Sequence, residues 1–189
     1  MSIYRDLMTT QYSEIARKFK VNPNHCDNPE HYETYIIQDC FADHSQGMGV
    51  THAFVSENDE TGEKTIAGYI TLRASSLTMD MDDYKSGYPA LEISELAVDC
   101  NFEGIGLGTD MVKTAIAEAI SLNDTTIGFR FVVLCADPAA VGFYSKLGFS
   151  KIPSYQEIPR EHRNKNCVYA FEAEEYYKNT LSLAEAVRE

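Results

Sequence analysis

The most regular pattern of hydrophobic and polar positions lies between residues 91 and 149. Residues 91–98 (LEISELAV) form a branched, mostly apolar run that predicts a buried strand. Three glycines at alternate positions, 104, 106 and 108, follow this run. Beyond them apolar residues recur at helical spacing. They predict a helix whose buried face contains Leu107, Met111, Ala115, Ile116, Ala119 and Ile120.

A second strand and a short helix come next. Residues 129–135 are almost continuously apolar, as expected of a strand buried on both faces. Asp137-Pro138 predicts the N-cap and first residue of a helix, which Gly148 ends. The order strand, helix, strand, helix predicts a parallel pair of strands in the middle of a mixed sheet.

The flanking segments complete a mixed α/β pattern. We expect a helix over residues 1–20, a second helix that opens at Asn28-Pro29, and a hairpin over residues 51–77. Residues 78–89 (TMDMDDYKSGYP) are acidic and lack apolar periodicity, which predicts a loop. Residues 150–152 and 167–173 predict two closing strands, and residues 174–189 a terminal helix. We interpret residues 1–189 as a single domain.

Composition narrows the class of protein. A chain of 189 residues that is 44% hydrophobic and 24% charged is typical of one globular domain. No run approaches the length of a membrane span, and the first residues lack the apolar region of a secretory signal. Five scattered cysteines argue against a disulfide framework, so we expect a cytoplasmic protein. The formal charge of −13 argues against general affinity for nucleic acids.

The glycine turn between strand and helix suits an anion. Glycine lets successive backbone N–H groups point the same way, and the helix N-terminus adds partial positive charge. The spacing G-x-G-x-G differs from the dinucleotide fingerprint G-x-G-x-x-G. Thr109-Asp110 stands where a nucleotide P-loop has lysine and serine or threonine. Two interpretations of the turn therefore remain open. It is either a site where backbone amides alone hold a diphosphate, such as that of coenzyme A, or a purely structural turn.

Two motifs in this region resemble the acetyl-CoA-binding core of the GNAT N-acetyltransferase superfamily. The family turn Arg/Gln-x-x-Gly-x-Gly/Ala is similar to residues 103–108 (EGIGLG), preceded by a typical Leu-Ala-Val-Asp at 96–99. The family block Asn-x-x-Ala-x-x-Phe-Tyr, followed by Gly-Phe, is similar to residues 137–144 and 148–149. Glu103 replaces the usual Arg or Gln, which puts a negative charge beside the diphosphate site, and Asp137 replaces Asn.

The resemblance implies a fold, a co-substrate and a set of binding residues. The fold is a central mixed sheet of about seven strands flanked by helices, in which a splayed parallel pair of strands holds acyl-CoA. The co-substrate is acetyl-CoA, with no metal. The implied binding residues are Leu96, Ala97, Val98, Glu103, Gly104, Ile105, Gly106, Leu107, Gly108, Thr109, Asp137, Ala140 and Phe143.

Acetyl transfer to an amine needs a neutral amine, a stabilised oxyanion and a protonated leaving thiolate. By resemblance Tyr144 is the general acid, and Glu92 lies where several members carry a catalytic glutamate. Ser94 shares the strand face of Glu92, whereas Glu95 points the other way unless a bulge intervenes. Some members of the family have no dedicated base. In an enzyme of that kind, these glutamates would only hold the substrate ammonium. We interpret Cys135 as a buried structural thiol.

One polar segment contains metal-capable side chains without a metal-binding pattern. His25, Cys26, Asp27 and His31 lie close together in the sequence, but no second pair at a suitable spacing follows. We therefore interpret this segment as a polar loop.

Three further features lie outside this core: a cysteine-containing loop before the second helix (Cys26), Gly-Tyr-x-x-Leu at residues 68–72 and Tyr-Pro at residues 88–89. With them, nearly the whole chain resembles a GNAT subgroup that includes toxins of bacterial toxin–antitoxin pairs. Those toxins acetylate the amino group of aminoacyl-tRNA and have an antitoxin partner. A cluster of basic residues that suits tRNA contains Lys146, Lys151, Arg160, Arg163 and Lys165. The acidic loop with Asp80, Asp82 and Asp83 suits instead a small cationic amine or a peptide amine. A non-catalytic acyl-CoA-binding regulatory module is a third alternative, and a homodimer is left open.

Overall fold

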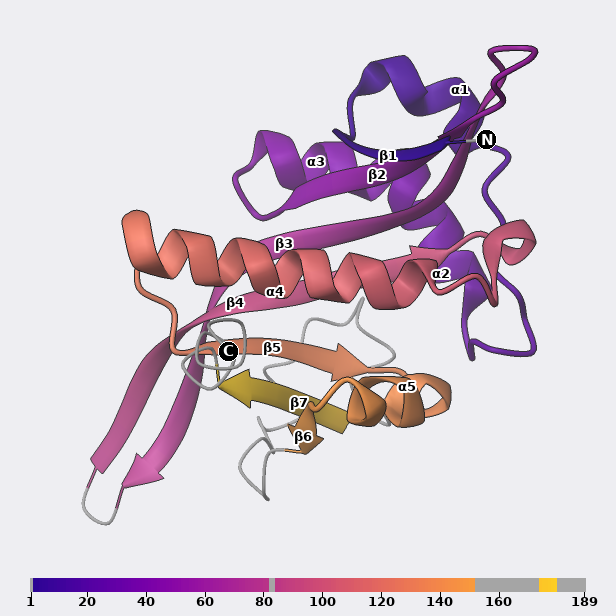
Figure 1. Ribbon diagram of the computed structural model, residues 1–189. Helices are drawn as coiled ribbons and strands as arrows, with labels where there is room; N and C mark the ends of the chain where they lie inside the picture. Colours follow the sequence, from indigo (N-terminus) through magenta and orange to yellow (C-terminus); the bar gives the residue numbers. More distant parts are fainter. Residues whose placement is uncertain (1, 82–83, 152–173, 180–189) are drawn as a thin grey trace. The chain divides into compact units, whose positions relative to one another are not determined.

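The computed structural model describes residues 2–81, 84–151 and 174–179. The chain divides into two compact units. Unit 1 consists of Met1–Arg73 and Ile93–Ala115, and unit 2 of Ala74–Glu92 and Ile116–Glu189. Two strands, β3 (Lys64–Met81) and β4 (Tyr84–Val98), and one helix, α4 (Leu107–Thr125), run through both units (Figure 1). The single domain over residues 1–189 stays a prediction.

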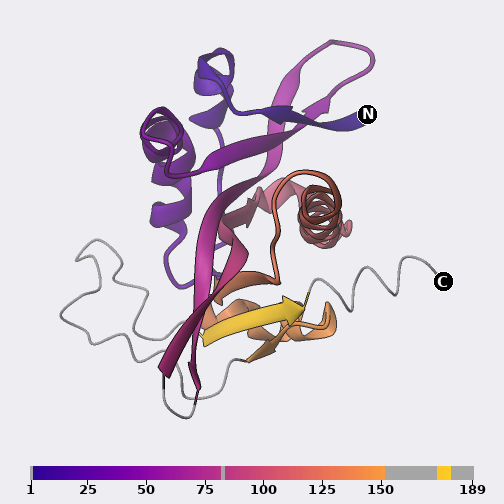
Figure 2. The ribbon, with the colours of Figure 1, turned by 90° about the vertical axis from the view of Figure 1, so that its left-hand side faces the viewer.

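Unit 1 is a sheet with helices on both faces. Its strands follow the order β1-β2-β3-β4. The bounds of its other elements are β1 (Ser2–Leu7), η1 (Thr10–Tyr12), α1 (Ser13–Ala16), α2 (Pro29–Thr34), the π-helical turn η2 (Tyr35–Asp39), α3 (Cys40–Ser45), β2 (Val50–Glu57) and η3 (Cys100–Phe102). Both β1 with β2 and β2 with β3 pair antiparallel. Figure 2 shows α2 and α4 on opposite sides of these strands.

The predicted N-terminal helix is wrong for most of its length. Residues Ser2–Leu7 form β1, whose register with β2 runs from Ser2↔Glu57 to Leu7↔His52. Helix forms only at Ser13–Ala16. The apolar spacing of this segment fits a short strand as well as a helix, and pairing with a distant strand decides between them.

The second predicted helix is confirmed and runs without a break from α2 through η2 into α3. Asn28 is its N-cap and accepts a hydrogen bond from His31 N at 3.2 Å, while Pro29 takes the first helical position. The buried face packs Tyr35 and Ile36 into the main core of unit 1. The other fully or nearly buried members of that core include Phe19, Val55, Ile66, Tyr69 and Ala97.

Unit 2 contains the strand order β3-β4-β5-β7-β6. The elements that lie only in this unit are β5 (Phe131–Ala136), η4 (Pro138–Ala140), α5 (Val141–Lys146), β6 (Ser150–Lys151) and β7 (Glu174–Asn179). Strand β7 pairs antiparallel with both β5 and β6. The arrows of β4 and β5 point the same way in Figure 1, and α4 connects them, as predicted for the parallel pair. Leu77, Ala90 and Phe131 form a small core here.

Two predictions within unit 2 are wrong. Residues 78–89 were expected to be a loop, yet β3 continues to Met81 and β4 begins at Tyr84. Strand pairing carries the backbone through a sequence whose polar side chains hide the strand pattern. Glu174–Asn179 was expected to begin a helix, but it forms β7. The strand predicted at 167–173 lies outside the described residues.

The mixed α/β class and the sheet of seven strands are confirmed in the described part of the chain. The splay of the parallel pair stays a prediction. Within the described ranges, no helix is both long and apolar enough to cross a membrane.

Candidate active site

The glycine turn is an exposed cradle of backbone amides. Gly104 and Gly106 have φ values of 77° and 89°, which side chains rarely tolerate. A Cβ at either position would meet no atom within 4 Å, so the turn is open. Helix α4 begins at Leu107, and Asp110 N donates to Gly106 O at 3.1 Å. The amides of residues 107–109 precede that bond and have no partner within the helix, so they suit an anion such as a diphosphate.

The strand that leads into the turn lies close to its neighbours. Ala97 is 6% exposed, whereas Leu96 and Val98 are half-buried. A Cβ on Gly68 of β3 would lie 3.0 Å from Ala97 O and 3.0 Å from Met111 Sδ. Only glycine therefore allows β3, the end of β4 and the first turns of α4 to approach this closely.

The predicted binding residues of the turn differ in exposure. Ile105 is 61% exposed, while Leu107, the first residue of α4, is buried. Gly108 and Thr109 are half-buried. Any contact of Leu107 with a ligand would thus come from its backbone.

The unusual residue Glu103 is held by the loop after α1. Its Oε2 accepts a hydrogen bond from Asn22 Nδ2 at 3.0 Å and lies 3.0 Å from His25 Nδ1. Sequence reasoning placed Glu103 beside the turn but gave it no partner. Nothing local signals this contact, because Glu103 is 78 positions from His25.

Asp99 anchors the segment that enters the glycine turn, a role that the sequence analysis did not predict. Its side chain is almost fully buried and caps η3 by accepting from Asn101 N at 2.9 Å. Its second oxygen accepts from Lys20 N at 2.9 Å. The carboxylate therefore fixes the loop after α1 to the segment that enters the glycine turn. An aspartate directly after a strand and two residues before an Asn-Phe is a recognisable cap signal.

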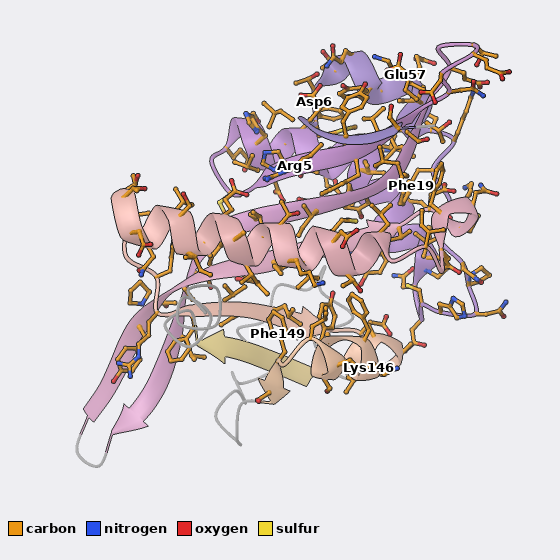
Figure 3. All side chains as sticks on the ribbon, in the orientation of Figure 1. Arg5, Asp6, Phe19, Glu57, Lys146 and Phe149 are labelled. Atoms are coloured by element: carbon orange, nitrogen blue, oxygen red, sulfur yellow. The ribbon has the colours of Figure 1, made fainter. Side chains whose placement is uncertain are left out.

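Tyr144 belongs to an aromatic cluster in unit 2. The side chain is 7% exposed, and its ring centroid lies 4.9 Å from that of Phe143 and 5.9 Å from that of Phe149. The amides of Phe149 and Gly148 donate to Tyr144 O at 3.1 Å and to Ser145 O at 3.0 Å, which forms a Schellman cap. Figure 3 labels Phe149 at this corner. The ring of Tyr144 thus packs against two aromatic neighbours beside a capped helix end, and its catalytic role stays a prediction.

Asp137 has the capping role predicted for it. Its Oδ1 accepts from Ala139 N at 2.9 Å, and Pro138 begins η4. Ala140 and Phe143 are half-buried. The carboxylate thus serves the turn that carries α5, and the binding role that the resemblance implies for these three residues stays a prediction.

The strand glutamates have different surroundings. Both carboxylate oxygens of Glu95 lie within 3.2 Å of His31 Nε2 on α2, and the Glu95 side chain is 16% exposed. The hydrogen bond to Glu95 raises the pKa of His31, while burial lowers it. Glu92 is half-buried. Ser94, on the face predicted for Glu92, donates weakly to Thr71 O at 3.4 Å.

The two histidines of the segment with metal-capable side chains contact carboxylates from other parts of unit 1. His31 and His25 are engaged by different carboxylates, Glu95 and Glu103. No group of three or more His, Cys, Asp or Glu side chains in the described ranges could hold a metal ion. Cys135 is exposed, so the prediction of a buried thiol is wrong.

The predicted site residues fall into two groups. Leu96, Ala97, Val98 and the turn residues lie in unit 1, whereas Tyr144 and the η4–α5 residues lie in unit 2. Glu92 is the last residue of Ala74–Glu92, a segment that belongs to unit 2. The assembly of both groups into one active site stays a prediction.

Comparison with known proteins identifies the family. The family model described as "Acetyltransferase (GNAT) family" matches residues 8–149. Similar solved structures include a tyrosine-to-phenylalanine mutant of KacT, with 16% identity, a TM-score of 0.73, and coverage of 98% of this chain and 99% of that chain. A tyrosine-to-phenylalanine mutant of the AtaT toxin, bound to the C-terminus of the antitoxin AtaR and acetyl-CoA, shares 16% identity with a TM-score of 0.71 over 100% of both chains.

A third similar structure is AtaT complexed with acetyl-methionyl-tRNAfMet, with 17% identity, a TM-score of 0.72, and coverage of 98% of this chain and 99% of that chain. At these identities the solved structures demonstrate a shared fold, while the family model spans most of this sequence. The protein therefore belongs to the GNAT family of acetyltransferases, enzymes that take acetyl-CoA as co-substrate.

Proposed function

We propose that this protein transfers the acetyl group of acetyl-CoA to the amino group of an aminoacyl-tRNA, as a toxin that an antitoxin restrains. The observation that carries the proposal is the end-to-end likeness to AtaT, which covers 100% of both chains with a TM-score of 0.71. Because the likeness includes the segments outside the GNAT core, it favours the toxin subgroup over GNAT enzymes in general. AtaT itself has been solved with acetyl-methionyl-tRNAfMet and with AtaR.

The glycine turn supplies the proposed site for the diphosphate of acetyl-CoA. The amides of residues 104–109 would donate to it, with the α4 N-terminus adding partial positive charge. The end of β4, at Leu96, Ala97 and Val98, would line the pantetheine arm. The open turn and the first amides of α4, which have no partner within the helix, support this assignment.

Tyr144 is the proposed general acid. The amine nitrogen attacks the thioester carbonyl carbon, and the tetrahedral intermediate collapses as the C–S bond breaks. The phenol of Tyr144 would give its proton to the leaving thiolate, which yields free CoA. The packing of the Tyr144 ring against Phe143 and Phe149 supports this role, because proton transfer needs a donor group in a defined position.

Glu92 is the proposed acceptor of the proton that the amine loses. Its position in the sequence, where the family resemblance puts a catalytic glutamate, supports a role of Glu92 toward the substrate ammonium, either as a base or as an anion that holds it. Glu95, on the same strand, contacts His31.

Exchange of Tyr144 for Phe tests the chemistry. Tyr144→Phe should lower kcat about 10²–10⁴-fold and leave the Kd for acetyl-CoA unchanged, because only the proton donor is removed. Tyr4→Phe on β1 is the matched control and should retain full turnover. The substrate is a set of charged tRNAs with labelled acetyl-CoA, measured in single turnover. An unchanged rate for Tyr144→Phe would leave Tyr144 as a core aromatic only.

Growth after induction tests the toxin. The wild-type chain should arrest growth, Tyr144→Phe should not, and the cognate antitoxin should restore growth.

The net charge of −13 favours a different acceptor, a small cationic amine. Equal, healthy growth with wild type and variant, combined with acetylation of a polyamine but not of charged tRNA, would replace the toxin with that second function.

A further inference from the structure

Glu103 presents an electrostatic problem at the proposed acetyl-CoA site. The residue directly precedes Gly104, and its side chain is 27% exposed. A diphosphate on the amides of residues 104–109 would carry negative charge next to this carboxylate. Like charges close together in a partly desolvated setting repel, so an uncompensated Glu103 would weaken binding.

The loop after α1 compensates that charge. Glu103 Oε2 accepts from Asn22 Nδ2 at 3.0 Å and lies 3.0 Å from His25 Nδ1. An ionised carboxylate only accepts hydrogen bonds, so His25 must donate from Nδ1 in this contact. The imidazole is 68% exposed, and the contact is an ion pair when the ring is protonated.

Several bonds hold this loop against the segment that enters the turn. The backbone of Lys20 donates to Asp99 Oδ2 at 2.9 Å and accepts from Cys100 N at 2.8 Å. Within the loop, Asn22 O accepts from His25 N at 3.0 Å. Both partners of the His25–Glu103 contact are therefore anchored to η3, within unit 1.

We infer that His25, assisted by Asn22, is part of the acetyl-CoA site: it neutralises Glu103 so that the neighbouring amides can hold the diphosphate. This inference rests on the proposed binding of acetyl-CoA at the glycine turn. His25 and Asn22 are positioning residues, since they act through Glu103 and not on the acetyl group. The competing explanation is a clamp, in which the contact only ties two loops together.

Charge compensation and the clamp predict opposite effects of Glu103→Gln on the affinity for acetyl-CoA. If charge matters, Glu103→Gln removes the repulsion, and the variant binds acetyl-CoA at least as tightly as wild type. If the contact is only a clamp, Glu103→Gln and His25→Gln both loosen the loop and weaken binding alike. The double variant completes the comparison, because His25 should have no effect once the charge of residue 103 is gone.

The experiment is calorimetric titration of the full chain with acetyl-CoA at low salt. His25→Gln should bind about fivefold more weakly than wild type, as expected of one exposed ion pair. Glu103→Gln and the double variant should bind equally well and no worse than wild type. His44→Gln, at an exposed histidine of α3, is the matched control and should equal wild type. Weaker binding by Glu103→Gln, or no loss in His25→Gln, overturns the inference.

A second ligand isolates the diphosphate. S-acetyl-pantetheine lacks it, so its affinity should be the same for wild type and for His25→Gln. An equal loss for both ligands would contradict charge compensation.

Gly106→Asp separates this inference from the proposed function. If wild type and Gly106→Asp bind acetyl-CoA equally, the turn is not the site and both proposals fail. If only Gly106→Asp loses binding, the turn stands and the inference on His25 falls.

Discussion

His31 and Glu95 form a half-buried pair between α2 and β4, with Nε2 3.1 Å from Glu95 Oε2. The hydrogen bond to Glu95 raises the pKa of His31, and the charges of Glu95 and Asp39 add to the increase, whereas burial opposes it. Tyr32 and Tyr35 lie beside the imidazole, with ring centroids at 5.1 and 6.4 Å. The pair therefore links protonation of one histidine to the stability of unit 1.

The sign of this linkage follows from the raised pKa. The folded state holds the His31 proton more tightly than the unfolded chain, in which a histidine has a pKa of about 6.5. The stabilising effect is thus complete below that pH and is lost as the pH rises through the higher folded pKa. We expect the free energy of unfolding of wild type relative to Glu95→Gln to fall from pH 5.5 to 8.5.

Urea unfolding at a series of pH values measures this difference. The matched control is His44→Gln, which removes an exposed histidine of α3 that is not part of this pair. If the difference between wild type and Glu95→Gln is the same at every pH, the His31 proton does not contribute to folding.

Residue-scale prediction from the sequence succeeded where the signal is local. Asn28-Pro29 and Asp137-Pro138 begin helical segments as predicted, because each cap bonds to an amide two or three residues away. The pairs His31–Glu95 and His25–Glu103 escaped prediction because their members are 64 and 78 positions apart. Such contacts form only when the fold brings distant segments together. From the sequence alone, the segment between Lys20 and His31 is therefore interpreted as a polar loop.

At the scale of elements, the pattern predicted the buried core strands and α4 better than the sheet edges. The predicted buried face of α4 is confirmed at Met111, Ala115, Ile116 and Ala119. Strand β1 was mistaken for a helix, and the ends of β3 and β4 for a loop. These segments gain their structure from backbone pairing with distant strands, so their own side chains need not show a strand pattern.

Gly68 tests the close approach of β3, β4 and α4. In Gly68→Ala the new methyl would meet Ala97 O and Met111 Sδ at 3.0 Å each. The sulfur can move, but the carbonyl belongs to the strand backbone, so β3 and β4 must shift. We expect unfolding to become easier by about 1–3 kcal/mol, with a lower Tm.

Gly142→Ala is the control for Gly68→Ala, because a Cβ at Gly142 in α5 would meet no atom within 4 Å. That helical substitution should leave Tm unchanged or raise it. A Gly68→Ala protein as stable as wild type would mean that the strands separate at little cost.

At the scale of the whole molecule, charge is the main difficulty for a tRNA substrate. The chain has 16 basic and 29 acidic residues, and its net charge of −13 repels phosphates at long range. Binding would then depend on a local basic surface. Lys146 is exposed at the end of α5 (Figure 3) and Lys151 lies in β6, while Arg160, Arg163 and Lys165 lie outside the described residues.

Salt dependence separates the two acceptor classes. If these basic residues contact tRNA phosphates, kcat/KM for charged tRNA should fall steeply with salt. Replacing Arg160, Arg163 and Lys165 with Ala should make the slope of log kcat/KM against log salt shallower by about two, since each contact to single-stranded or duplex phosphates contributes about 0.7–0.9. The same triple variant should acetylate a polyamine as wild type does. If instead the wild-type protein acetylates the polyamine but not charged tRNA, and neutralising Asp80, Asp82 and Asp83 raises KM for the polyamine, the acidic segment steers a cation and the small amine is the substrate.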